Sequence, residues 1–296
     1  MKKPLLGIME RSSVISKVLL LLALMLMLTL LFIGLYLVLS EGSQSTASLK
    51  VMQVLQTFGT FMLPCFIAVS LWSREPLKWL QLNKGLHWQE ALVAVLLMLC
   101  ASPFINLLAS LNEQLVLPSF LSGLEELIKQ QEEAANILTE RFIQADDIGI
   151  LFVNILIMAL LPAFSEELCF RGTLQKLFAG KNTHIAVWTS AIIFSAIHFQ
   201  FYGFIPRMLL GALFGYMLLW SGSLWLPVLA HFTNNCIAVL TYNILYMNGR
   251  NVEDVDAFGT GDTLWIGILS AIVTSAMIYL LFRISTKYKM SLLDNE

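Results

Sequence analysis

The sequence predicts an all-α integral membrane protein, a bundle of about eight transmembrane helices with an amphipathic helix in one outer loop. Of its 296 residues, 57% are hydrophobic and only 13% are charged, and the mean hydropathy is +0.75. A soluble domain carries roughly 25% charged residues, so this chain has too few polar side chains to cover a surface in water. Runs of about 20 apolar residues, the length that crosses a bilayer, recur throughout. We therefore expect a single membrane domain over residues 1–296.

Eight apolar runs are candidates for the spanning helices. They lie near residues 18–40, 51–73, 88–111, 148–178, 184–201, 205–221, 223–246 and 263–283. The first run follows a basic segment, but it is too long for the apolar region of a signal peptide and lacks a convincing cleavage site with small residues. We therefore expect it to be retained as the first helix.

The basic residues indicate an orientation, because cytoplasmic loops of membrane proteins carry an excess of Lys and Arg. With eight helices and a cytoplasmic N-terminus, the inner segments hold 13 of the 18 basic residues, namely Lys2, Lys3, Arg11, Lys17, Arg74, Lys78, Lys84, Arg171, Lys176, Lys181, Arg283, Lys287 and Lys289. The outer segments hold the remaining 5, which are Lys50, Lys129, Arg141, Arg207 and Arg250. We therefore expect a multi-pass protein of the cell membrane with both termini in the cytoplasm.

The longest outer connection, residues 112–147, has the pattern of an amphipathic helix. Its apolar residues recur at helical spacing, and they are Leu121, Leu124, Leu127, Ile128, Ala135, Leu138 and Phe142. Its glutamates mostly occupy the other side, at Glu125, Glu126, Glu132, Glu133 and Glu140. We expect a solvated helix that caps the bundle. The functional alternative is a lid or a surface for docking a partner.

Ionisable and amide side chains are concentrated in three of the predicted helices. Ionisable groups inside a membrane cost several kcal/mol each, so they are rare there and usually functional. The fourth run carries Glu166, Glu167 and Arg171, the fifth carries His198, and the seventh carries His231 and Asn235. Residues 148–246, which include all of them, are the expected catalytic core.

The spacing within the fourth run predicts an ion pair. Glu167 and Arg171 are four residues apart, so they share a helix face and can pair. Glu166 is turned by about 100° from Glu167. We therefore expect Glu166 to face a different neighbour and to be free to handle a proton.

The two histidines and the asparagine are predicted to converge with Glu166. His231 and Asn235 are four apart, so their polar groups point into one volume, and His198 would enter from a third helix. Counted from the same membrane face, the depths of Glu166, His198 and His231 agree within about two helical turns, so a shared site is feasible. Asn234, next to Asn235, is expected to be a bystander.

Such a site contains what peptide hydrolysis requires. A glutamate with a histidine can deprotonate water for attack on a carbonyl, and a second histidine with an asparagine can donate hydrogen bonds to the resulting oxyanion. In a second interpretation, Glu166, His198 and His231 are zinc ligands that leave one position open for water. The sequence contains no H-E-x-x-H motif, and both interpretations stay open. The four cysteines lack CxxC spacing and are expected to be buried apolar residues.

The three motifs resemble those of the CPBP family, the CAAX-protease and bacteriocin-processing family, which is also called Abi. Its patterns Glu-Glu-x-x-x-Arg, Phe-x-x-x-His and His-x-x-x-Asn occur here in order, as Glu166-Glu167 to Arg171, Phe194 to His198, and His231 to Asn235. The resemblance covers roughly residues 165–235. Each motif alone is weakly specific, whereas all three together in membrane helices are strongly specific.

The resemblance also implies roles for these residues. Glu166 would activate water together with His198, and His231 with Asn235 would form the oxyanion site. The pair of Glu167 and Arg171 would be structural or would orient the substrate. Eukaryotic members of the family cut prenylated CAAX ends, while many bacterial relatives act in peptide maturation, in bacteriocin self-immunity or as scaffolds. Nothing in this sequence selects a prenylated substrate.

The sequence thus predicts an intramembrane endopeptidase that hydrolyses a membrane-associated or lipidated protein or peptide. The partners would be this substrate and the lipid bilayer, with no nucleic acid. The sequence requires no cofactor, and zinc is the one that these residues could bind. Two alternatives are a catalytically silent scaffold or bacteriocin-immunity protein, and a proton-coupled transporter. The intact motifs argue against the scaffold, and the absence of an evident inverted repeat argues against the transporter.

Overall fold

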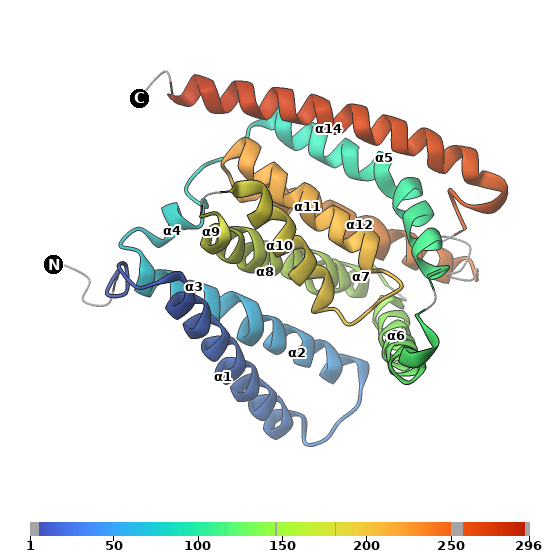
Figure 1. The fold of residues 1–296 in the computed structure, drawn as a ribbon. Helices are drawn as coiled ribbons and strands as arrows, with labels where there is room; N and C mark the ends of the chain where they lie inside the picture. The colour runs from blue at the N-terminus through green and yellow to red at the C-terminus, as the bar shows by residue number, and fades with distance from the viewer. Residues whose placement is uncertain (1–5, 116, 146, 181, 250–256, 294–296) are drawn as a thin grey trace.

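The computed structural model describes residues 6–293 except 116, 146, 181 and 250–256 (Figure 1). Within this part of the chain the regular elements are helices, and there is no β-strand. Six of the described helices are long and apolar enough to cross a membrane, namely Val14–Ser40, Thr46–Trp72, Trp88–Glu113, Ile148–Phe178, Phe204–Ser221 and Gly261–Met290. The predicted all-α, polytopic membrane fold is confirmed.

The eight predicted runs all fall on helices. Five of them correspond to α1 (Val14–Ser40), α5 (Trp88–Glu113), α11 (Phe204–Ser221), α12 (Trp225–Met247) and α14 (Leu264–Leu293). The second run is a continuous helix made of α2 (Thr46–Thr57), a π-helical turn η1 (Phe58–Met62) and α3 (Leu63–Trp72). Short elements lie in the connections: α4 (Pro76–Trp79), η2 (Ser119–Leu121) and η5 (Gly261–Thr263).

The helix that carries the glutamates contains two π-helical segments. It runs through α7 (Ile148–Asn154), η3 (Ile155–Leu160), α8 (Leu161–Glu167), η4 (Leu168–Leu174) and α9 (Gln175–Phe178). In η4 the Thr173 hydroxyl donates to the carbonyl of Leu168, five residues earlier (2.9 Å). Single π-helical turns inside α-helices occur frequently at functional sites, and this one begins directly after Glu167.

The fifth predicted run forms a shorter helix than expected. α10 (Thr183–Ala196) has 14 residues, and residues 197–203 form a connection to α11. The chain leaves the helix here because Phe199 adopts a left-handed backbone conformation with φ of 53°, which an α-helix does not accommodate. His198 therefore lies just beyond α10. The expectation that it enters the site from within a spanning helix is wrong.

Both ends of the described chain lie at the same end of the helix bundle (Figure 1). Before α1, the Gly7 amide donates to the Ser70 carbonyl near the end of α3 (3.0 Å). Near the end of α14, the Tyr288 hydroxyl donates to Gln89 at the start of α5 (2.5 Å). This arrangement agrees with an even number of membrane crossings.

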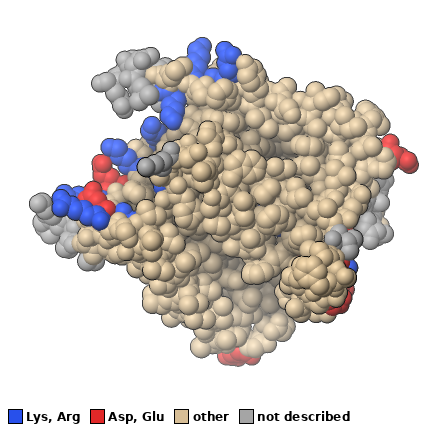
Figure 2. Space-filling view, viewed as in Figure 1, with Lys and Arg blue, Asp and Glu red and all other residues tan. Residues whose placement is uncertain are grey.

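Basic side chains gather at this end of the bundle. Figure 2 shows most of the visible Lys and Arg side chains on the left of the view, whereas Asp and Glu are spread over both ends. We call this end of the helix bundle the basic end. Four residues counted in the predicted orientation, Lys2, Lys3, Lys181 and Arg250, lie outside the described residues. That the basic end faces the cytoplasm stays a prediction.

The predicted amphipathic helix is α6 (Ser122–Ile143), which lies across the opposite end of the bundle (Figure 1). It contacts the connection between α10 and α11 through two glutamates. Glu132 accepts a hydrogen bond from the Tyr202 amide (2.9 Å), and Glu125 accepts one from the Tyr202 hydroxyl (3.1 Å). Burial raises the pKa of the Glu132 carboxyl, although its hydrogen bond to Tyr202 acts in the opposite direction.

α10 and α11 pack closely at two glycines of α11, which bring the backbones together. A Cβ atom at Gly211 would lie 3.0 Å from Arg171 Nη2 and 3.1 Å from a ring carbon of Phe194. A Cβ atom at Gly215 would lie 3.0 Å from Val187 Cγ1. Small residues four apart allow such close approach of membrane helices. This packing brings the α11 backbone within reach of Arg171.

The four cysteines are free thiols, and they differ in burial. Cys65 and Cys169 are fully buried in the apolar cluster around Leu168 and Phe170, as predicted. Cys100 and Cys236 are only partly buried.

Candidate active site

The predicted ion pair between Glu167 and Arg171 is present. Arg171 Nη1 donates to Glu167 Oε1 (2.8 Å), and both side chains are completely buried. Arg171 Nη2 donates to the Gly211 carbonyl of α11 (3.0 Å). Its guanidinium also lies over the Phe194 ring, 4.4 Å from the centroid. Arg171 is thus enclosed by protein and holds Glu167 in one position.

His231 lies between the two glutamates. Its Nδ1 is 2.8 Å from Glu167 Oε1, and its Nε2 is 3.8 Å from Glu166 Oε2. The ring stacks on Phe214 with centroids 5.1 Å apart and planes 21° apart. The expectation that Glu166 and Glu167 face different neighbours is wrong, because an imidazole has a nitrogen on each side and can meet two carboxylates at once. Glu167 therefore orients His231.

His198 also has one ring nitrogen held by the protein. Its Nδ1 lies 2.7 Å from the Phe194 carbonyl. A carbonyl only accepts hydrogen bonds, so this contact assigns the proton to Nδ1. In the neutral ring Nε2 is then left with a free lone pair that can accept a proton.

One cavity of about 290 Å³ brings all four predicted catalytic residues together, and we call it the catalytic cavity. It is lined by Ile105, Glu166, Phe194, His198, Gly203, Pro206, Arg207, Leu210, Phe214, His231, Asn234 and Asn235. The convergence that helical spacing predicted for three segments is therefore present in the structure. The catalytic roles of the four residues stay predictions.

Two polar residues of the cavity, Asn234 and Arg207, are not assigned to it by the sequence. Asn234 was expected to be a bystander, yet it lines the cavity and its amide donates to Asn235 Oδ1 (3.4 Å). Arg207 was counted only as a basic residue of an outer segment, although it lies in the first turn of α11 and lines the cavity. A cation next to a long apolar run was the signal that could have identified it.

A zinc ion in this cavity would need Glu166, His198 and His231 as its ligands. Both histidines have Nδ1 held by a protein oxygen, which is the usual arrangement behind a metal-binding Nε2. In the described part of the chain, however, no three His, Cys, Asp or Glu side chains are grouped closely enough to hold an ion. The residues as they lie do not fit a zinc site, so the chemistry below is derived from the side chains alone.

A second cavity of about 280 Å³ adjoins the catalytic cavity toward α6. It is lined by Asn106, Ala109, Ser110, Glu113, Glu132, Asn136, Gln200, Tyr202, Gly203 and Arg207. Gly203 and Arg207 belong to both cavities. Because Glu113 and Asn136 are exposed, this outer cavity opens at the end of the bundle opposite the basic end.

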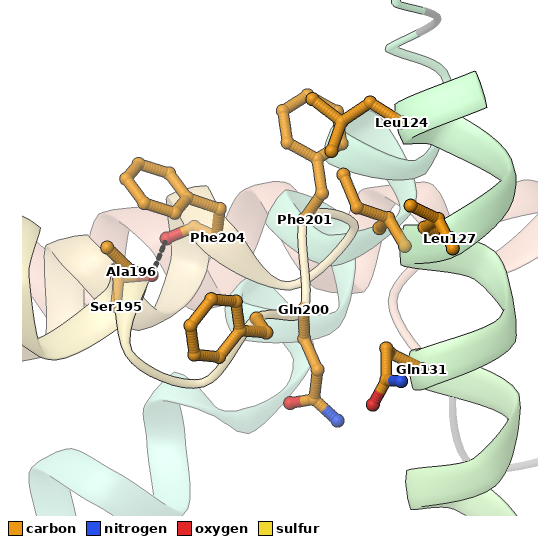
Figure 3. A pocket seen from close by; sticks show the side chains of 10 residues that line it. Leu124, Leu127, Gln131, Ser195, Ala196, Gln200, Phe201 and Phe204 are labelled. Carbon is orange, nitrogen blue, oxygen red and sulfur yellow. Dashed lines mark hydrogen bonds between the residues drawn. The ribbon is translucent and has the colours of Figure 1, made fainter. Parts of the chain in front are cut away.

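An apolar pocket of about 330 Å³ lies nearby, between α6 and the connection after α10. Figure 3 shows Leu124 and Leu127 of α6 on one side of it and Phe201 on the other. The Ser195 hydroxyl donates to the Phe204 carbonyl (2.7 Å) and closes the turn at its edge (Figure 3). The pocket is large enough for an apolar group beside the outer cavity.

The fold and the catalytic cavity together define a polytopic helical membrane protein with a carboxylate, histidine and amide site among its helices. Residues 148–237 match the model of a family described as type II CAAX prenyl endopeptidase Rce1-like. This range includes each motif residue from Glu166 to Asn235, so the predicted resemblance to the CAAX-protease family is confirmed. At the level of the family, the match supports an intramembrane protease of the CAAX type.

One curated protein is also similar to part of the chain. It is the uncharacterized protein YpbD of Bacillus subtilis (strain 168), which is 41% identical over 83 residues. The similarity covers 27% of this chain and 40% of YpbD, so the chain spans less than half the length of that relative. No solved structure matches the chain significantly.

Proposed function

We propose that the protein is an intramembrane endopeptidase that hydrolyses a membrane-associated or lipidated peptide with a water molecule activated by Glu166 and His198. The observation that carries the proposal is the meeting of Glu166, His198, His231 and Asn235 at one cavity among the helices. The match of residues 148–237 to a family of endopeptidases supports it. The apolar pocket beside α6 is consistent with an apolar substrate group.

The first half of the reaction is the addition of water to the peptide carbonyl. Glu166 takes a proton from the water while the water oxygen bonds to the carbonyl carbon. His198 Nε2 orients the water by accepting a hydrogen bond from its second O–H group. The carbonyl oxygen becomes an oxyanion. Asn235 donates to this oxyanion through its amide, and His231 donates through Nε2.

The charges around His231 allow it to act as such a donor. Its Nδ1–H donates to Glu167, so donation from Nε2 as well requires the protonated ring. With His231 protonated, the charges of Glu166, Glu167, Arg171 and His231 sum to zero, which limits the cost of burying them. The ion pair with Arg171 therefore holds the Glu167 carboxylate, and through it the His231 ring, in place.

The second half is the departure of the amine. The proton held by Glu166 passes to the peptide nitrogen, the C–N bond breaks, and the products are a carboxylic acid and an amine. Glu166 returns to its starting carboxylate form. The step needs no covalent intermediate with the enzyme.

The decisive comparison is Glu166→Gln against Asn235→Ala. Glu166→Gln is nearly isosteric and removes the proton acceptor, so we expect it to abolish cleavage while the protein still folds. Asn235→Ala removes one oxyanion donor, so turnover should fall by about 10²–10³-fold while substrate affinity survives. Turnover and affinity would be measured for both variants in the same lipid, with a membrane-peptide library as substrate.

Glu133→Gln is the matched control, because Glu133 is exposed on α6 and the chemical change is identical. It should leave turnover unchanged. Metal analysis of the same purified samples would test zinc directly. Near-normal turnover of Glu166→Gln would contradict the mechanism, whereas absence of cleavage by the wild-type protein would favour a catalytically silent scaffold.

A further inference from the structure

Arg207 lies where the catalytic cavity and the outer cavity meet. Both cavities include this residue and Gly203 in their lining. A peptide bound across both cavities would therefore lie beside the Arg207 guanidinium. The proposed mechanism does not use this group.

The hydrogen bonds of Arg207 leave its charge without a carboxylate partner in the described residues. Nη2 donates to Gln200 Oε1 (2.7 Å) and Nη1 donates to the Gln200 carbonyl (3.3 Å). None of the ion pairs between described residues includes Arg207. Glu166 and Glu132 are the acidic groups whose charges act on it, and both lie beyond ion-pair distance. A partly buried guanidinium of this kind has capacity for one more anion.

Helix stability does not account for this placement. Arg207 lies in the first turn of α11, where the helix dipole favours negative charge and disfavours a cation. The structural explanation for an arginine at this position is that its hydrogen bonds to Gln200 tether the connection 197–203. A neutral donor would serve that purpose equally well, because both acceptors on Gln200 are uncharged.

We propose that Arg207 binds a carboxylate of the peptide substrate and thereby sets the distance between that carboxylate and the bond that is cut. The guanidinium presents parallel N–H groups that match a carboxylate in a bidentate manner. The carboxylate is either the free C-terminus of the substrate or an Asp or Glu side chain. This inference rests on the proposed peptidase function and adds a selection rule to it.

Binding to the inactive Glu166→Gln protein tests the inference separately from catalysis. The probes are dansylated apolar tetrapeptides in three forms: the free acid, the C-terminal amide, and the amide with one internal Asp. They would be titrated against protein in vesicles of phosphatidylethanolamine and phosphatidylglycerol. We expect one carboxylate form to bind on the order of tenfold more tightly than the neutral amide, since charge-assisted hydrogen bonds are the strong ones. The two carboxylate forms distinguish a chain end from a side chain.

Variants at the junction then assign the preference to Arg207. Arg207→Gln should bind all three forms equally, and Arg207→Lys should keep part of the preference. Gln200→Ala, the matched control, removes the hydrogen bond to Gln200 Oε1 but keeps the one to the Gln200 carbonyl and the charge of Arg207, so it should keep the preference. Gly203→Ala should weaken it, because the added Cβ would lie 2.8 Å from Arg207 Nη2 and displace the guanidinium.

The same variants in the active protein separate positioning from chemistry. Arg207→Gln should raise KM for the carboxylate substrates more than for the neutral amide, and the change in KM should exceed any change in kcat. Equal binding of all three probes to protein with intact Arg207 would overturn the inference, even if Arg207→Gln fails to fold. A fall in kcat for every probe would overturn it too and assign Arg207 to the oxyanion. If the probes bind as expected but wild-type protein cleaves nothing, the proposed function fails and the carboxylate site stands.

Discussion

At the scale of single residues, one glutamate supports most of the site. Glu167 Oε1 accepts from Arg171 and also contacts His231. Its second oxygen, Oε2, is buried and has no hydrogen-bond partner among the described residues. The position of the His231 ring therefore depends on Glu167, and the position of Glu167 depends on Arg171. We therefore expect Arg171 to act on the chemistry through Glu167.

We predict that Arg171→Ala lowers stability as well as activity. It removes the cation that neutralises a fully buried carboxylate, and breaking one partner of a buried ion pair costs about 3–5 kcal/mol. The double variant Glu167→Gln with Arg171→Met should recover part of the folding, because no charge is then left unpaired, but His231 would lose its orienting carboxylate and turnover should stay low. Thermal unfolding in detergent, with turnover on the same samples, measures both effects. A fully stable Arg171→Ala protein would show that the ion pair contributes nothing to the fold.

At the scale of the elements, the contact between α10 and α11 positions the site. Gly211 allows the guanidinium of Arg171 and the ring of Phe194 to lie against the α11 backbone. Phe194 in turn supplies the carbonyl that holds His198 Nδ1. Gly211 thus lies next to Arg171, which holds Glu167, and next to Phe194, which holds His198.

We predict that Gly211→Ala destabilises the protein by about 1–3 kcal/mol, which is the usual cost of adding a methyl group to a closely packed interior. Turnover should fall as well, because Arg171 and Phe194 must shift. Gly34→Ala in α1 is the control, since a Cβ there would meet no atom of the described residues within 4 Å. It should be neutral or slightly stabilising, because alanine favours a helix over glycine. Equal unfolding temperatures for the two variants would contradict a close approach at Gly211.

At the scale of the whole molecule, the charges and the cavities together predict the side of the membrane from which substrate arrives. Lys and Arg gather at the basic end, where both ends of the described chain also lie (Figures 1 and 2). The outer cavity opens at the other end. If the basic end is cytoplasmic, as the excess of positive charge favours, the site receives substrate from outside the cytoplasm.

We predict that reporter fusions at residue 1 and residue 296 both report the cytoplasm. In a background with the four native cysteines replaced, Asn136→Cys at the outer cavity should react with a membrane-impermeant thiol reagent in intact cells. Lys78→Cys, at the basic end and also exposed, should react only after permeabilisation. Fusions on opposite sides would mean that the number of crossings is odd. Labelling of Lys78→Cys alone in intact cells would mean that the orientation is inverted.

The class of fold, most helix positions and the meeting of Glu166, His198, His231 and Asn235 at one cavity could be predicted from the sequence. Apolar runs of bilayer length have few other stable structures, because only helices and closed barrels satisfy backbone polar groups in lipid. The polar motifs stand out within these runs because polar side chains are costly in lipid and therefore rare there. Helical spacing then predicted the pairing of Glu167 with Arg171 correctly, because that contact lies within one continuous helix.

The tertiary structure alone decided the contacts that join different helices. Nothing in the spacing within one helix places His231 between Glu166 and Glu167, ends α10 before His198, or brings Arg207 to the catalytic cavity. These features depend on how α10, α11 and α12 pack, which is set by contacts such as that of Gly211 with Arg171. Periodicity records which side of a helix a residue occupies, whereas the identity of the neighbour on that side follows from packing.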